Sequence, residues 1–176
     1  LIILAIQVLT SKGISAPARL GELINVLTTS TGLPYGICSG QGWESEKTID
    51  LSSYHKLKTA SLFVAATKMG AISAGEDPEP WAELGQRIGE AFQVADDLKD
   101  FSDSQKSGKS NNRDRENERP NAVLKLGEQG AIKRLQDILA GAIASIPSCP
   151  GEVELIKIVR SQAERLTPVE PLQKTL

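Results

Sequence analysis

Residues 89–100 read GEAFQVADDLKD, and their apolar side chains recur three and four positions apart rather than two. That spacing is typical of an α-helix with one buried face. The same period continues in both directions along the chain, for example in Leu20, Leu23 and Leu27. No β-hairpin signal or internal repeat interrupts it, so the sequence predicts an all-α helical bundle.

The predicted helices are separated by segments that commonly begin or end helices, such as SAP at 15–17, GLP at 32–34 and GEDPEP at 75–80. A length of 176 residues corresponds to about one domain, so we expect residues 1–176 to form a single domain. The predicted helices cover residues 1–11, 16–31, 33–42, 53–75, 79–102, 120–126, 128–146 and 151–165.

Composition excludes several classes of partner. The chain has 20 basic and 22 acidic residues, so no large basic field favours nucleic acid or an anionic membrane. The longest apolar run, LIILAI, has six residues against the roughly 20 that span a bilayer. Cys38 and Cys149 show no spacing typical of a metal or disulfide framework, which fits a reducing cytoplasm. Because the sequence opens inside a helical pattern without Met, we expect it to be the C-terminal part of a longer protein.

The acidic residues of the opening stretch indicate a ligand. Gln93, Asp96, Asp97 and Asp100 are spaced i, i+3, i+4 and i+7, which predicts one stripe along a helix. Carboxylates so placed repel one another and lie toward the helix C-terminus, where negative charge is unfavourable. A divalent cation removes both penalties, and Mg²⁺ takes one or two carboxylates together with substrate phosphates. The alternative is a solvated acidic stripe that is balanced by Lys99.

A second group of polar residues points to the same kind of ligand. The segment YHKLKTASLF at 54–63 begins a predicted helix, and Lys58 and Thr59 project from its first turns. Lys58 can contact a phosphate and Thr59 can steady a developing charge, although a lysine on a helix is most often only solvated. His55 is interpreted as structural. The charged segment 103–120 carries Lys106, Lys109 and Arg119, which can close over an anionic ligand or form a solvated connection.

These motifs together resemble the trans-type isoprenyl diphosphate synthases. In that family a Phe-Gln pair precedes Asp-Asp-x-x-Asp, as in residues 92–100, and the resemblance continues in GICSGQ at 36–41, KTASLF at 58–63 and SGK at 107–109. It spans essentially the whole chain. GLPYGICSGQGWESE, RPNAV and AIASIPSCPGE are more narrowly similar to the geranylgeranyl diphosphate synthases of carotenoid and bacteriochlorophyll pathways in photosynthetic proteobacteria.

The resemblance implies a helical bundle around a deep central cavity and a homodimeric enzyme. The implied reaction condenses isopentenyl diphosphate with an allylic diphosphate and uses three magnesium ions. Lys58 and Lys109 would contact the allylic diphosphate, and Thr59 and Gln93 would lie beside the allylic carbon, where their oxygens stabilise the carbocation. The implied metal ligands, acting directly or through water, are Asp96, Asp97 and Asp100.

The sequence also departs from the family pattern. Asp96 and Asp97 are the only adjacent aspartates, so the family's first aspartate-rich motif is missing, together with the upstream segment that would bind isopentenyl diphosphate. Two other functions therefore stay open. One is a non-catalytic prenyltransferase-like subunit that modulates a partner synthase. The other is an unrelated helical module whose acidic stripe binds a basic partner.

Overall fold

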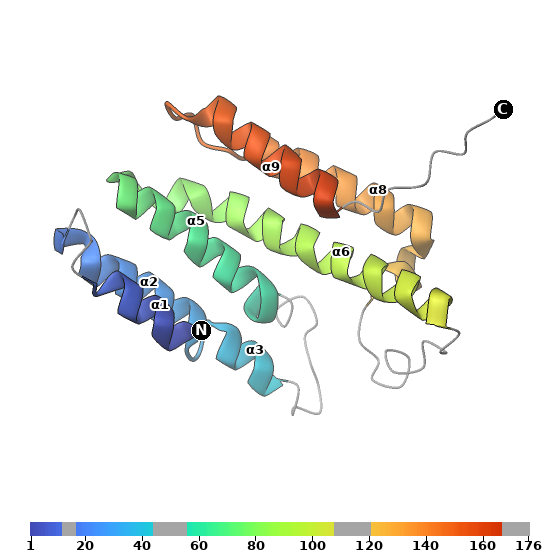
Figure 1. The fold of residues 1–176 in the computed structure, drawn as a ribbon, viewed down its shortest axis with the longest axis horizontal. Helices are drawn as coiled ribbons and strands as arrows, with labels where there is room; N and C mark the ends of the chain where they lie inside the picture. The colour runs from blue at the N-terminus through green and yellow to red at the C-terminus, as the bar shows by residue number, and fades with distance from the viewer. Residues whose placement is uncertain (12–16, 44–55, 108–120, 167–176) are drawn as a thin grey trace.

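A computed structural model of the chain describes residues 1–11, 17–43, 56–107 and 121–166, and every regular element within these ranges is a helix (Figure 1). The all-α class is thereby confirmed. The α-helices are α1 (Ile2–Leu9), α2 (Leu20–Thr31), α3 (Ile37–Trp43), α5 (Ser61–Ala74), α6 (Ala82–Ser107), α8 (Ala122–Ala144) and α9 (Glu152–Leu166). Two 3₁₀ turns, η1 (Pro17–Arg19) and η3 (Glu79–Trp81), and one π-helical turn, η2 (Lys56–Ala60), precede α2, α6 and α5 respectively.

Helix α6 is the centre of the bundle, with α5 on one side and α8 and α9 on the other (Figure 1). Its buried side chains pack against buried side chains of α8, so the main core lies between these two helices. Leu135 of α8 is 0% exposed and stands inside this cluster. The core residues are Ala91, Val94, Ala95, Leu98, Val123, Ala131, Leu135, Ile138 and Leu139.

Glycine allows α6 to approach its neighbour on the other side without side chains between the two backbones. A Cβ atom at Gly85 would lie 2.5 Å from Cα of Val64, and one at Gly89 would lie 2.7 Å from Cα of Ala60. Such distances are far below normal contact, so only glycine fits at this helix spacing. Gly85 and Gly89 are four residues apart and therefore lie on one face of α6.

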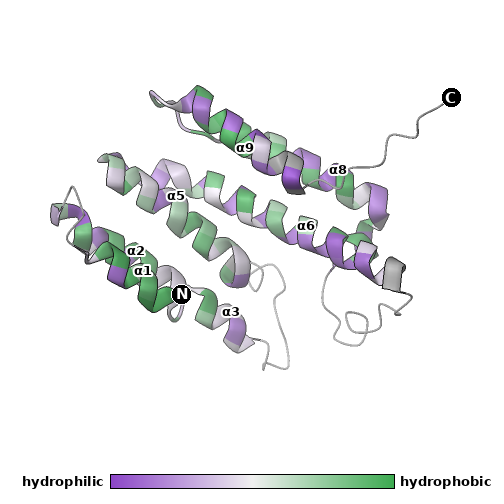
Figure 2. Cartoon of the chain, in the orientation of Figure 1, coloured by the Kyte–Doolittle hydropathy of each residue, from purple (hydrophilic) through white to green (hydrophobic). Residues whose placement is uncertain are grey.

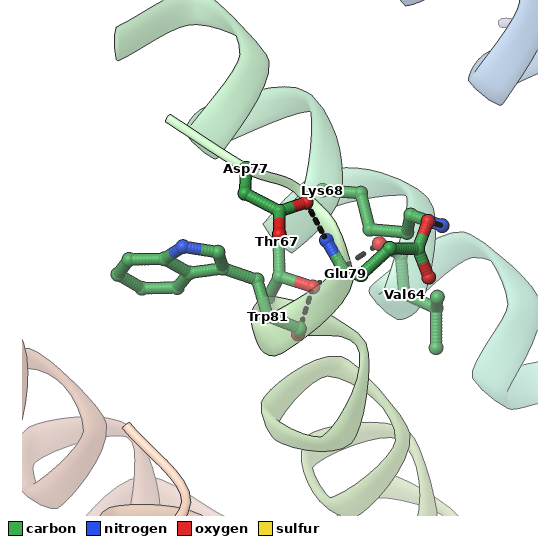
Figure 3. Close-up of polar contacts among 6 residues, drawn as sticks. All are labelled: Val64, Thr67, Lys68, Asp77, Glu79 and Trp81. Atoms are coloured by element: carbon green, nitrogen blue, oxygen red, sulfur yellow. Dashed lines mark hydrogen bonds and ion pairs between the residues drawn. The ribbon is translucent and has the colours of Figure 1, made fainter. Parts of the chain in front are cut away.

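The turn between α5 and α6 is held by side chains that bond to the backbone (Figure 3). Gly75 ends α5 in the left-handed conformation, with a φ of 88°. The Thr67 hydroxyl donates to the carbonyl of Trp81 at 2.9 Å, and the Asp77 carboxylate accepts from the N–H of Glu79 at 3.0 Å. Lys68 pairs with Glu79 at 2.6 Å. These bonds fix the point at which α6 turns back along α5.

The predicted helix boundaries differ from the structure at several places. The helix predicted over 33–42 begins only at Ile37, after a turn that contains Pro34. The predicted break between 120–126 and 128–146 is a kink inside α8, where Gly127 has a φ of 72° and a ψ of 167°. Helix α6 continues to Ser107, five residues beyond its predicted end, so the predicted segment 103–120 begins as helix. Residues 108–120 of that segment lie outside the described part of the chain.

Helix α1 is apolar but buries none of its side chains. Leu1, Ile3, Leu4 and Val8 are all more than half exposed, and α1 is coloured mostly as hydrophobic in Figure 2. Despite this run, no helix in the described ranges has the length and hydropathy that a membrane span requires.

Candidate functional site

A cavity of about 590 Å³ lies where η2, α6 and the beginning of α8 meet. Thr59 enters its lining from η2, and Gln93 and Asp97 enter from α6. Asn121, the residue directly before α8, and Lys125 of α8 are also among the lining residues. The cavity thus gathers three of the residues singled out in the sequence, from two segments that are 34 positions apart.

These three residues form a continuous chain of hydrogen bonds. The Thr59 hydroxyl donates to Oε1 of Gln93 at 3.1 Å, and Nε2 of Gln93 donates to Oδ1 of Asp97 at 3.2 Å. Oδ2 of Asp97 accepts from the backbone N–H of Ala122 at 2.7 Å. The chain therefore joins η2, α6 and the first residue of α8.

The arrangement follows from a four-residue repeat along α6. Gly85, Gly89, Gln93 and Asp97 follow one another at four-residue intervals, along a row that is inclined to the axis of α6. The two glycines bring α5 and η2 into direct contact with α6, and the next two positions carry the polar side chains that bond. A π-helical turn, which often occurs at functional sites, places Thr59 opposite Gln93.

A glycine also fixes η2 from its other side. A Cβ atom at Gly40 of α3 would lie 2.6 Å from the backbone nitrogen of Lys58, so α3 packs directly against the turn that carries Thr59. The side chain of Lys58 is half-buried and is not part of the cavity lining. The predicted contact of Lys58 with the diphosphate stays a prediction. Lys109, Arg119 and His55 lie outside the described ranges, so their predicted roles also stay predictions.

Side-chain oxygens accept hydrogen bonds from the first three backbone N–H groups of α8. Oδ1 of Asn121 accepts from the N–H groups of Val123 at 2.8 Å and Leu124 at 3.2 Å, which is an N-cap. The Asp97 carboxylate takes the remaining N–H of Ala122. Negative charge is favourable at a helix N-terminus, typically by about 0.3–1 kcal/mol and by up to ~2 kcal/mol where it is partly buried.

The structure divides the predicted acidic stripe into two faces. Asp97 is 8% exposed and lines the cavity, whereas Asp96 and Asp100 are exposed and are not part of the lining. The physical reason is the helical period, because each residue turns about 100° and neighbouring Asp96 and Asp97 must point in different directions. Asp97 lies over Gln93, and Asp100 lies over Asp96.

A complete metal site is not formed by the described side chains alone. Within the described ranges no three His, Cys, Asp or Glu side chains are grouped so that they could hold a metal ion. Asp96 and Asp100 nevertheless present two accessible carboxylates one helical turn apart. Mg²⁺ commonly takes one or two carboxylates and completes its octahedron with phosphate oxygens and water, so these residues fit part of a magnesium site.

Sequence reasoning assigned no role to several residues around this cavity. Asn121 is one, although an Asn directly before an apolar helical segment is a recognisable N-cap signal. Lys125 and Arg134 of α8 also line the cavity, and Arg134 pairs with Glu90 of α6 across it. No pattern in the sequence connects Arg134 with a residue 44 positions earlier.

Comparison with known proteins gives a consistent result. The family model described as polyprenyl synthetase matches residues 1–157. The chain is 55% identical over 171 residues to a geranylgeranyl diphosphate synthase of Cereibacter sphaeroides, covering 97% of this chain and 59% of that protein. It is 52% identical over 170 residues to a protein of the same name from Rhodobacter capsulatus, covering 96% and 59%. The chain thus spans about three fifths of the length of these relatives.

Two solved structures have a similar fold. A putative farnesyl-diphosphate synthase from Marinomonas sp. MED121 matches with a TM-score of 0.66 and 24% identity, over 94% of this chain and 59% of that one. A geranyltransferase from Legionella pneumophila matches with a TM-score of 0.68 and 21% identity, over 93% and 57%. At these identities the likeness supports the all-α fold.

Proposed function

The chain belongs to the polyprenyl synthetase family, and on that premise we propose that it serves a prenyltransferase reaction. In this reaction isopentenyl diphosphate condenses with an allylic diphosphate, with geranylgeranyl diphosphate as the product. The observation that carries the proposal is the hydrogen-bonded chain Thr59–Gln93–Asp97 on the wall of the cavity. Its support is the 55% identity to a relative whose name states that product.

The residue types suit the ionisation of an allylic C–O bond. This step leaves a diffuse carbocation and a concentrated diphosphate anion, so the site needs neutral dipoles near the carbon and positive charge near the diphosphate. The oxygens of Thr59 and Gln93 are such dipoles, because each keeps a lone pair after making the bond between them. A strong nucleophile would trap the cation, and the described lining contains no Cys or His.

Magnesium is the cofactor in this proposal. When bound, it neutralises the negative charge that builds up on the departing diphosphate. Asp96 and Asp100 would hold it through their exposed carboxylates, and the buried Asp97 would support the site from behind them without direct coordination. Lys58 and Lys109 would contact the diphosphate, which gives that anion positive charge from protein as well as metal.

A second cavity supports the binding of a hydrocarbon chain. It has a volume of about 250 Å³, and its lining includes Tyr35, Leu57 and Val64. Ala60 and Gln86 line both cavities, so the two spaces adjoin at these residues. A growing prenyl tail could extend from one into the other and so leave water.

The proposed setting is a single domain, a homodimeric complete enzyme and a cytoplasmic location. A non-catalytic subunit that modulates a partner synthase is the alternative function. The bond between Thr59 and Gln93 argues against it, because a purely structural subunit has no use for polar groups held against the cavity. The family membership argues against an unrelated helical module.

A chimera tests the proposal. Residues 1–176 would replace the matching region of the Cereibacter sphaeroides relative, and the product would be assayed with labelled isopentenyl diphosphate and farnesyl diphosphate. We expect magnesium-dependent formation of a twenty-carbon diphosphate. Asp103→Asn removes an acidic side chain at an exposed position of α6 outside the cavity lining. A chimera with this control substitution should retain activity. A chimera that unfolds cooperatively but makes no prenyl product would refute the proposal.

A further inference from the structure

We propose that Asp97 is a positioning residue that fixes the orientation of the Gln93 carboxamide from the N-terminus of α8, and that it does not coordinate metal directly. The geometry of this inference comes from hydrogen bonds among described residues. Its consequence for catalysis rests on the proposed function.

The Gln93 carboxamide has a defined orientation between its two neighbours. A carboxylate can only accept hydrogen bonds, so the group of Gln93 that meets Oδ1 of Asp97 must be the NH₂. Oε1 of Gln93 then faces Thr59, whose hydroxyl must donate to it. The negative charge of Asp97 therefore sets the direction of both hydrogen bonds. It places the negative end of the Gln93 amide dipole beside Thr59.

Asp97 is itself held in place by a hydrogen bond and by the packing of its neighbours. It is 8% exposed, and its Oδ2 accepts a 2.7 Å bond from the first N–H of α8. Asn121 caps the adjacent N–H groups of the same turn, so this end of α8 is already ordered by side chains. On α6, the neighbouring Val94 and Leu98 are buried in the core against α8. Asp97 is thus fixed by two packed helices.

Asp97 differs from Asp96 and Asp100 in its exposure to solvent. Direct coordination of Mg²⁺ favours carboxylates that can reach water and phosphate oxygens. Asp96 and Asp100 are exposed, whereas Asp97 is 8% exposed and each of its oxygens accepts a hydrogen bond, from Ala122 and from Gln93. The acidic cluster therefore has two tasks, since its exposed members hold the cation and its buried member orients a neutral dipole.

Reversal of the Gln93 carboxamide would change the charge that faces the reacting carbon. If Asp97 became an amide, its NH₂ would face Gln93, and Gln93 would rotate to present its oxygen to residue 97. Nε2 of Gln93 would then face Thr59, which can accept as well as donate. The hydrogen-bond chain would survive in reverse, but the positive end of the dipole would lie where the carbocation develops.

The first measurement is hydrogen exchange of side-chain amides by NMR in the ligand-free chain. We expect the Gln93 NH₂ to exchange about tenfold or more slowly than that of exposed Gln136, the factor expected for a hydrogen bond to a charged group. Thr59→Val should leave this protection in place, because the bond to Asp97 remains. Asp97→Asn should weaken it, because the NH₂ would then bond to the neutral hydroxyl of Thr59 in place of a charged carboxylate. Protection that is lost in Thr59→Val and kept in Asp97→Asn would overturn the inference.

The second measurement separates positioning from metal binding in the active chimera. Asp97→Asn should lower kcat by on the order of 100-fold, as expected for a misplaced catalytic group, without raising the magnesium concentration needed for half-maximal rate. Asp96→Asn should raise that concentration. An equal rise in Asp97→Asn and Asp96→Asn would identify Asp97 as a direct ligand and overturn the inference.

The two measurements keep the inference and the proposed function apart. A chimera with the unchanged sequence that folds and makes no product is a failure of the proposed function, while the exchange data still decide the orientation of Gln93. If Asp97→Asn does not fold, the comparison of the unchanged chain with Thr59→Val decides it alone.

Discussion

Replacement of Gly89 by alanine tests the close approach that builds the site. The new Cβ would lie 2.7 Å from Cα of Ala60, 3.0 Å from Cβ of Ala60 and 3.2 Å from Cδ2 of Phe63. Ordinary van der Waals contact begins at 3.4 Å, so α6 and η2 must separate by about 0.7 Å at this point.

The expected magnitude comes from two opposing terms. Overpacking of this kind costs about 1–3 kcal/mol, whereas alanine gains about 1 kcal/mol over glycine in a helix. The free energy of unfolding should therefore fall by roughly 0–2 kcal/mol. Gly70→Ala in α5 is the matched control, because nothing lies within 4 Å of its new Cβ. It should gain up to about 1 kcal/mol.

The effect on the site should exceed the effect on stability. Thr59 precedes Ala60, so the same separation lengthens the 3.1 Å bond from Thr59 to Gln93 to about 3.8 Å, which is no longer a hydrogen bond. A misplacement near 1 Å commonly costs on the order of 100-fold in rate. We therefore expect the Gly89→Ala chimera to turn over about 10–100-fold more slowly than the Gly70→Ala chimera.

Circular dichroism melts and product assays on the two variants provide the measurement. At about 2–4 °C per kcal/mol for a chain of this size, their midpoints should differ by roughly 2–12 °C, with Gly89→Ala lower. If Gly89→Ala raises the midpoint as much as Gly70→Ala and retains its turnover, the helices are not in contact as described, and the reasoning is refuted.

Three further predictions concern the core, the cap and the acidic cluster. Leu135→Ala removes a side chain that is 0% exposed, so it should cost about 2–5 kcal/mol in chemical denaturation, more than any surface change. Asn121→Ala deletes the cap of α8 and should cost about 1 kcal/mol; a midpoint equal to that of the unchanged chain would contradict the capping bonds. Asp96→Ala at an exposed position should leave the midpoint nearly unchanged while it cuts turnover of the complete enzyme by orders of magnitude, and near-normal turnover would rule out the metal assignment.

The fold was predictable because helix periodicity is a local property. The repeat of apolar residues identified α6 and α8, and even the break at Gly127 was visible as a glycine inside the pattern. The spacing of Gly85 and Gly89 is equally visible, but sequence does not say which backbone approaches them. That information depends on tertiary packing, which here brings Ala60 and Val64 against α6.

The candidate site was predictable only in part. The sequence identified Thr59, Gln93 and Asp97, and the structure brings them together. The sequence pattern predicted the same role, metal binding, for Asp96 and Asp97. Neighbouring residues of a helix point about 100° apart, and a single stripe does not take this into account. The hydrogen bond that Asp97 accepts from Ala122 could not be predicted from sequence. Its donor is a backbone N–H 25 positions away, and every residue type except proline carries such a group.

The most direct test of the central claim is the rate of the first chemical step with and without the Gln93 amide. Single-turnover quench-flow on the chimera would compare the unchanged sequence with Gln93→Leu at saturating allylic diphosphate. We predict that Gln93→Leu slows the step by on the order of 100-fold while the Kd for the allylic diphosphate stays unchanged. An unaltered single-turnover rate would show that the amide does not face the reacting carbon, and the account of this cavity would be wrong.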